Sequence, residues 1–253
     1  MRYTKEKILD KVMDEMENPA TLYKGKFANY NGRINDGPFY IEVAADEILN
    51  HIDKLKEIKS LIDDKSLNSK SIKSYDRDHK GEHENQSKGS LDSEKYLAKT
   101  LYNICNSNDN EPGKKFDHIG KIFDYEIPLA TSSDDKAGRI DVVSFSDNSI
   151  YLLELKKKES KETLLRCALE IYTYYRQLNL EKFIDDFRTS GKLKEDFLAK
   201  DIVPAVLVFK EGRAYKQYKD MANFPKTRKL MDDLGVQLFV LGQEGSEYKV
   251  SLP

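Results

Sequence analysis

Three things are scarce in this 253-residue sequence: cysteine, long apolar runs and an excess of either charge. Its two cysteines, Cys105 and Cys167, lie in helical patterns of apolar residues, so we expect reduced packing residues rather than a disulfide. No run approaches the ~20 apolar residues that a membrane span requires. The first residues also lack the apolar segment of a secretory signal, and the sequence therefore predicts a cytoplasmic protein without a membrane partner.

The balance of charge argues against one class of nucleic-acid-binding protein. The chain contains 42 lysines and arginines and 44 aspartates and glutamates, which gives a net charge of −2 at pH 7. Proteins with a broad nonspecific footprint on nucleic acid are often strongly basic, so a contact here requires a local basic patch. The candidate patch for nucleic-acid binding consists of Lys157, Lys158, Lys161 and Arg166. The other interpretation of such a lysine run is a solvated strand end.

Residues 139–158 carry the strongest pattern in the chain. Residues 140–145 and 150–155 are rich in β-branched, aromatic and other apolar residues, as strands are. The Ser-Asp-Asn-Ser cluster at 146–149 is typical of a turn. The segment therefore predicts a β-hairpin in which facing residues have numbers that sum to about 295.

On that register Asp141 faces Glu154, with Cβ atoms roughly 4.5–5.5 Å apart. Because side chains alternate faces along a strand, Lys156 shares the face of Glu154, and Leu155 points the other way. Two carboxylates this close repel each other, and a divalent cation removes the conflict. Such oxygen ligands suit Mg²⁺, which polarises phosphoryl oxygens and lowers the pKa of bound water. Lys156 can then stabilise developing negative charge or position the attacking water.

An ordinary surface ion pair is the alternative interpretation of the same residues. Asp141 and Lys156 on an exposed strand face would form a salt bridge worth about 0–1 kcal/mol. The apolar residues at 142–143 and 152–153 argue against exposure, because they have the composition of a buried sheet. Charges in a buried sheet are costly unless they are paired or functional.

The chain is predicted to have three parts. Residues 1–63 form an α+β region that can recognise a target, make a homodimer contact or cover the sheet. Residues 64–92 are polar and read as a linker or long loop, and residues 93–253 form the domain of the hairpin. In the first part we expect helices at 3–17 and 45–63, with short strands and turns across 22–43. From residue 93 the expected order is helix, three strands, helix, strand, helix and strand, at 93–104, 122–130, 140–145, 150–155, 162–183, 202–209, 228–234 and 236–241.

This arrangement resembles the PD-(D/E)xK nuclease superfamily over about residues 93–242. The resemblance implies an α/β (α+β) fold with a restriction-endonuclease-like core, a central mixed sheet flanked by helices. It also implies that Asp141, Glu154 and the backbone carbonyl of Leu155 hold the metal, and that Lys156 is the catalytic lysine. Glu94 occupies the place of a glutamate that completes the site in many members; otherwise it is a helix-start glutamate favoured by the helix dipole.

Two features depart from the family pattern. Ile140 stands where many members have proline, and the helix after Lys156 carries Arg166, Glu170 and Tyr174 without the Gln-x-x-x-Tyr motif of some exonuclease-like branches. The expected function is that of a Mg²⁺-dependent endo- or exodeoxyribonuclease in which Mn²⁺ substitutes for Mg²⁺. An RNA-directed nuclease and a catalytically inactive interaction module remain alternatives.

Overall fold

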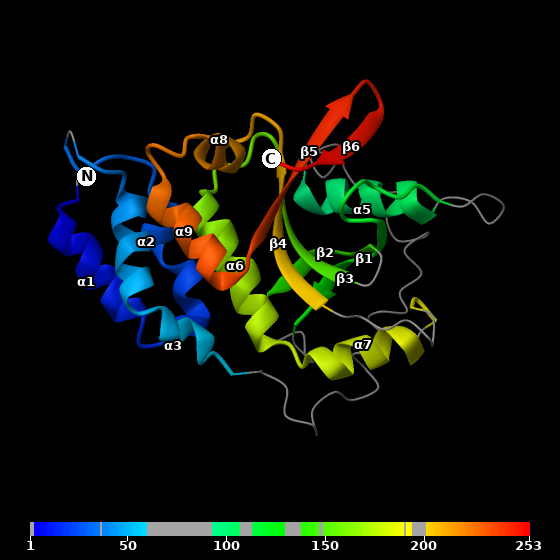
Figure 1. The fold of residues 1–253 in the computed structure, drawn as a ribbon, viewed down its shortest axis with the longest axis horizontal. Coiled ribbons are helices and arrows are strands. Elements are labelled where there is room, and N and C mark those ends of the chain that lie inside the picture. Colours follow the sequence, from blue (N-terminus) through cyan, green and yellow to red (C-terminus); the bar gives the residue numbers. More distant parts are fainter. Residues whose placement is uncertain are drawn as a thin grey trace.

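The protein is an α+β fold built on one mixed sheet (Figure 1). The structure, a computed structural model, describes residues 3–35, 37–59, 93–106, 113–129, 138–146, 149–189, 191–193 and 201–253. In the described parts six strands lie in sequence order: β1 (Lys121–Pro128), β2 (Arg139–Ser146), β3 (Ser149–Lys156), β4 (Asp201–Phe209), β5 (Gln237–Glu244) and β6 (Glu247–Ser251). β3, β4 and β5 run parallel, and the remaining neighbours are antiparallel.

The hairpin of β2 and β3 has the predicted register. Val142 pairs with Leu153 and Val143 with Leu152, so the numbers of facing residues sum to 295. Residues 147–148 of the predicted turn lie outside the described residues. The register agrees with the short connection, because only two residues separate Ser146 from its partner Ser149 and this length limits which residues can face each other.

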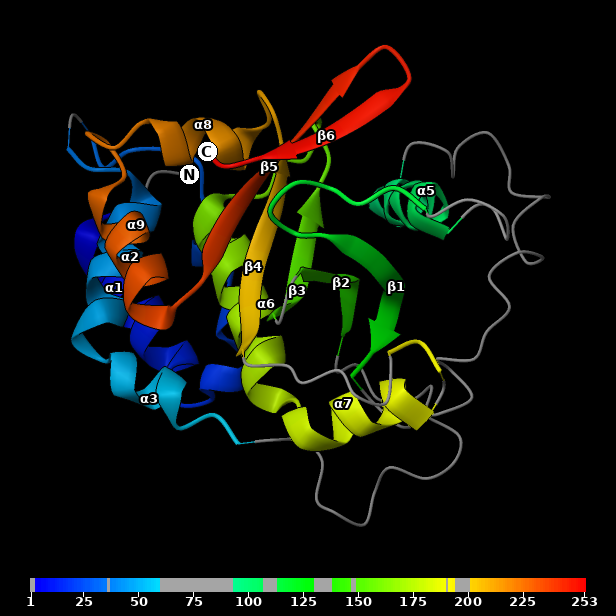
Figure 2. The same ribbon diagram turned by 45° about the vertical axis from the view of Figure 1, so that its right-hand side comes forward.

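Helices cover both faces of the sheet (Figure 2). The α5 helix packs on one face in a cluster with Leu153 and Leu155 of β3, whereas α6 packs on the other face in a cluster with Leu152. A sheet covered on both faces explains why β3 is buried at nearly every position. The helices are α1 (Lys5–Glu15), α2 (Tyr40–Asn50), α3 (Ile52–Lys56), α5 (Glu94–Asn106), α6 (Leu164–Gln177), α7 (Leu180–Thr189), α8 (Arg213–Lys219) and α9 (Pro225–Leu234), with 3-10 turns η1 (Pro19–Lys24) and η2 (Lys26–Asn29).

The strands predicted within 22–43 are wrong. This stretch contains η1, η2 and an isolated bridge between Arg33 and Phe39, and residues 41–43 belong to α2. The aromatic residues serve ring packing instead of a sheet: the rings of Tyr3 and Tyr30 stack with centroids 4.5 Å apart. The described part of the N-terminal region is therefore helical rather than α+β.

The single helix predicted at 162–183 is also wrong, because the structure has two helices there. Leu178 leaves α6 in an extended conformation with ψ of 140°. The side chain of Asn179 then accepts a hydrogen bond from the backbone N–H of Lys182 at 3.1 Å, which caps α7. Helix α8 and strand β6 were not predicted at all, and the linker predicted at 64–92 lies outside the described residues.

The N-terminal helices share their hydrophobic core with α6, α9 and one face of the sheet. A buried carboxylate joins α2 to α9. Glu42 of α2 accepts hydrogen bonds from the backbone N–H of Lys226 at 2.7 Å and from that of Thr227 at 2.9 Å, and a third from the Thr227 hydroxyl at 2.5 Å. Phe224, at the N-cap position of α9, makes no side-chain hydrogen bond, so a residue of another helix caps α9. Among the described helices none has the length and apolar character needed to cross a bilayer.

Candidate active site

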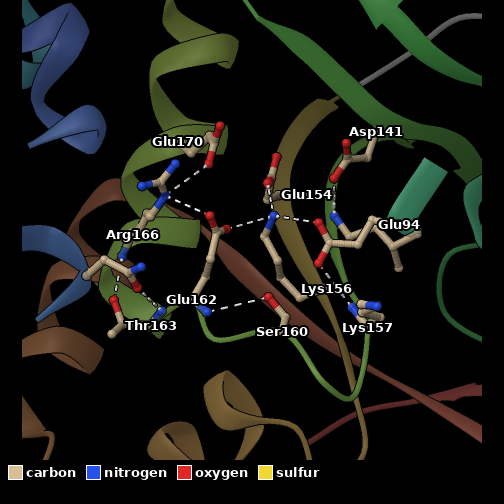
Figure 3. Close-up of polar contacts among 12 residues, drawn as sticks. Glu94, Asp141, Glu154, Lys156, Lys157, Ser160, Glu162, Thr163, Arg166 and Glu170 are labelled. Carbon is tan, nitrogen blue, oxygen red and sulfur yellow. Dashed lines mark hydrogen bonds and ion pairs between the residues drawn. The ribbon is translucent and has the colours of Figure 1, made fainter. Parts of the chain in front are cut away.

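The end of the β2–β3 hairpin brings together the residues predicted from its register. One step beyond the Val142–Leu153 pair, Asp141 and Glu154 lie on neighbouring strands and on the face that α6 covers. The backbone N–H of Leu155 donates a 2.8 Å hydrogen bond to Asp141 Oδ2, which ties this carboxylate to the strand of Glu154 (Figure 3). The predicted separation of the two carboxylates stays a prediction.

Lys156 is buried among carboxylates. Its side chain is 8% exposed, and its Nζ lies 2.7 Å from Glu154 Oε1. Glu162 Oε2 is 2.8 Å away and Glu94 Oε2 is 3.3 Å away (Figure 3). One ammonium group therefore contacts three acidic side chains, one from β3, one from α5 and one from the segment before α6.

Glu94 reaches this group from the opposite layer of the fold. It stands in the first turn of α5, where Ser93 Oγ accepts a 3.1 Å hydrogen bond from Tyr96 N and caps the helix. Besides Lys156, its carboxylate accepts a 3.4 Å hydrogen bond from Lys157 N. The structure thus places Glu94 beside the catalytic lysine that the resemblance predicts.

Glu162 and Glu170 are residues that the sequence did not predict for the site. They flank Arg166 at intervals of four residues, with Arg166 Nε 3.0 Å from Glu162 Oε1 and 3.8 Å from Glu170 Oε2. Tyr174, one turn further, donates a 2.8 Å hydrogen bond to Glu170 Oε1. The four-residue spacing of Glu162, Arg166 and Glu170 was the signal in the sequence that could have predicted this row, since residues four apart are neighbours on a helix surface. Arg166, predicted to contact nucleic acid, forms ion pairs within this row.

The carboxylate–lysine cluster has more acidic than basic side chains. Its members are Glu94, Asp141, Glu154, Lys156, Glu162, Arg166 and Glu170, that is, five carboxyl groups and two cations. Burial raises the pKa of Asp141 to about 7, although the Lys156 ammonium and the Leu155 N–H oppose the rise. Burial and the nearby Asp141 charge hold the pKa of Glu154 well above its ordinary value.

Lys156 remains a cation in this surrounding. Burial alone lowers the pKa of an ammonium group, but the negative charge around Lys156, with Glu154 foremost, raises it overall. Burial likewise raises the pKa of Glu170, against the pull of Lys156. The cluster therefore keeps its lysine charged, whereas Asp141, Glu154 and Glu170 hold protons more readily than ordinary carboxyl groups do.

The donor set fits a hard divalent cation. Oxygens of Glu154, Glu162 and Glu170 lie within 4.8 Å of one another, but Lys156 and Arg166 already bind this trio. Asp141 and Glu154, with the carbonyl of Leu155, remain the predicted ligands, and Glu154 belongs to both sets. Clustered carboxylate oxygens are the ligands that Mg²⁺ and Mn²⁺ accept.

The three lysines of the predicted basic patch lie outside the cluster, whereas its fourth member, Arg166, belongs to it. Lys158 and Lys161 are exposed, and Lys157 is half-buried. Lys158 Nζ lies 2.7 Å from Glu211 Oε2 in the loop after β4. These three lysines therefore border the site without neutralising it.

Comparisons with known proteins return nothing for this chain: no family model, no curated protein and no solved structure matches it. The case for its function rests on the geometry and charge of the cluster.

Proposed function

We propose that this protein is a metal-dependent phosphodiesterase that hydrolyses nucleic acid, with DNA as the expected substrate, on a restriction-endonuclease-like core. One observation carries the proposal. A buried, charged lysine stands next to buried carboxylates that outnumber the cations, at the end of a hairpin whose register joins Asp141 to Glu154. A fold that only needed an ion pair would balance these charges, because unpaired buried charge is destabilising.

Each residue has a role in this proposal. Asp141, Glu154 and the Leu155 carbonyl hold Mg²⁺, which when bound polarises the phosphoryl oxygen and lowers the pKa of a water. Lys156 supplies a fixed positive charge next to the reacting phosphate. Glu94 and Glu162 hold the Lys156 ammonium at its place, because each contacts it from a different side.

The deciding experiment compares substrates and metals. The protein is incubated with linear, circular and single-stranded DNA and with RNA, in Mg²⁺, Mn²⁺ or EDTA. We expect cleavage of DNA in Mg²⁺ and in Mn²⁺ and none in EDTA. Lys156→Ala should lower the rate by about 10²–10³-fold, as the loss of one preorganised electrostatic donor does.

A variant of a partly buried lysine is the matched control. Lys192 Nζ binds Asp124 Oδ2 at 2.7 Å, outside the cluster, so Lys192→Ala also breaks a partly buried ion pair. Lys192→Ala should keep the cleavage rate of every molecule that stays folded. Equal losses in the two variants, or wild-type cleavage in Lys156→Ala, would remove the role of Lys156. Cleavage of RNA alone would change the substrate, and no cleavage in any metal would reject the proposal.

A further inference from the structure

A concentration of positive charge extends from the loop after β3 onto helix α8. Residues 157–161 and 210–219 together contain seven lysines and arginines and two glutamates, a net charge of +5 in a chain of net charge −2. The seven cations, which we call the α8 basic surface, are Lys157, Lys158, Lys161, Lys210, Arg213, Lys216 and Lys219. The rest of the molecule is correspondingly acidic.

Contacts between the two segments make this one surface. Arg213 Nη1 donates a hydrogen bond to the backbone carbonyl of Lys161, and Lys158 forms its ion pair with Glu211. A Cβ placed on Gly212 would lie 3.5 Å from the carbonyl oxygen of Lys158, so the two backbones are in van der Waals reach. The position of the surface is thereby fixed relative to β3.

Helix α8 turns its cations outward. Its buried residues are Ala214 and Gln217, and Gln217 Oε1 accepts a 2.7 Å hydrogen bond from Leu164 N at the start of α6. Lys216 and Lys219 are three residues apart on the exposed side, and neither forms an ion pair with another described residue. Residues at this spacing are neighbours on a helix surface, so their charges act together.

The surface lies at the edge of the sheet where the cluster is. Lys156 pairs with Val208 in the parallel ladder, and the chain continues from Phe209 to Lys210 and α8. Figure 2 shows α8 next to the ends of β3 and β4. Ligands of sheets with parallel strands bind beyond the carboxyl ends of those strands.

We infer that the α8 basic surface binds the sugar–phosphate backbone of the nucleic acid, and the inference rests on the proposed function for the choice of this polyanion. Both cations of the cluster, Lys156 and Arg166, already pair with carboxylates and leave no free positive charge for a phosphate, so affinity for the substrate has to come from cations outside the cluster. Lys216 and Lys219 meet that need, because both are exposed and neither forms an ion pair with another described residue. The bond to be cleaved then lies at the cluster while the strand continues along α8.

Binding without cleavage tests this inference separately from catalysis. Fluorescence anisotropy in EDTA measures the affinity for a labelled DNA of about 20 base pairs, and for its single strand, between about 50 and 200 mM salt. In the variant Lys216→Gln/Lys219→Gln, affinity should fall about tenfold or more, and the slope of log K against log salt should fall by about 1 to 2. Lys5→Gln/Lys7→Gln on α1 removes the same charge from exposed lysines and should change neither quantity.

The outcomes separate binding from chemistry. The α8 variant should hydrolyse bis(p-nitrophenyl) phosphate at the wild-type rate, because that substrate is too small to reach α8. Wild-type DNA affinity in the α8 variant overturns the inference even if DNA is cleaved. Binding of anionic phospholipid vesicles in place of nucleic acid, or no binding of either, overturns it as well. Metal-independent binding that depends on α8 supports it even if no metal brings about cleavage, an outcome in which only the proposed function fails.

Discussion

Two buried glutamates in this molecule have opposite surroundings. Glu42 accepts three hydrogen bonds at the start of α9, where the helix dipole also favours negative charge. Glu154 has Lys156 as its ion-pair partner and shares it with Glu94 and Glu162, next to a further acid at Asp141. Hydrogen bonds from α9 satisfy the Glu42 carboxylate, whereas Glu154 shares its one cation with two other carboxylates. This difference agrees with a structural role for Glu42 and with the metal-binding role that we propose for Glu154.

The largest effect is expected on the metal response. Asp141→Asn retains an oxygen for the Leu155 N–H bond but loses a charged ligand, so the fold should survive and Mg²⁺ binding should not. In the wild type, Mg²⁺ at 100 times its Kd should stabilise the fold by about 2.7 kcal/mol. Thermal denaturation with and without Mg²⁺ measures this shift. A variant that keeps the full Mg²⁺-dependent shift would show that other residues hold the ion.

Glu42 should respond through stability. In Glu42→Gln, an amide NH₂ faces N–H donors in place of one carboxylate oxygen, so we expect a loss of about 2 kcal/mol. For a chain of this size, that corresponds to a midpoint about 4–8 °C lower. Glu47→Gln on the same helix, where the partner is the half-exposed His51, is the control and should cost less than about 0.5 kcal/mol. An unchanged midpoint in Glu42→Gln would mean that the cap of α9 does not matter.

Glu162 should have an intermediate effect on activity. Glu162→Gln removes one of the three carboxylates around Lys156, and Glu154 and Glu94 still hold the ammonium. We expect cleavage to slow by about tenfold, which corresponds to about 1.4 kcal/mol of transition-state stabilisation. A loss as large as that of Lys156→Ala would instead make Glu162 a ligand or a reacting group. The Glu162→Asp variant should recover part of the rate if position is what matters.

The smallest effect is also the sharpest contrast with Glu42. In EDTA, Glu154→Gln removes the repulsion between Glu154 and Asp141 and the cost of burying the Glu154 charge. Lys156 keeps Glu94 and Glu162 as acidic partners. The free energy of unfolding should stay unchanged or rise by about 0–1 kcal/mol, and the thermal midpoint should follow it. Calorimetry of the metal-free protein measures it next to Glu42→Gln. A loss of stability as large as that of Glu42→Gln would mean that Glu154 stabilises the metal-free fold, contrary to this prediction.

The parts of the site that the sequence predicted are those governed by local rules. Side-chain alternation and a short turn set which residues of β2 and β3 face each other, so Asp141, Glu154 and Lys156 could be placed together. Glu94 entered only through the family resemblance, since no local pattern links α5 to the hairpin.

The parts that were missed depend on contacts between distant segments. Glu162 meets Lys156 because the loop after β3 folds back, with Ser160 N bonded to Lys157 O at 3.1 Å. Nothing in the residues between them fixes that path. The aromatic residues of 22–43 were read as strands because local composition does not distinguish ring packing from a sheet.

The cap on α9 has a consequence for the order in which the molecule forms. Glu42 and its partner Thr227 are 185 residues apart in the chain. At about 5–20 residues per second, ribosomal synthesis separates their appearance by roughly 10–40 s. For that time α2 exists without the helix it caps, and the buried side of the N-terminal helices has no C-terminal partner. The N-terminal helices are thus made well before they can reach their final packing, and a nascent chain that stops before α9 leaves that apolar surface open to other molecules.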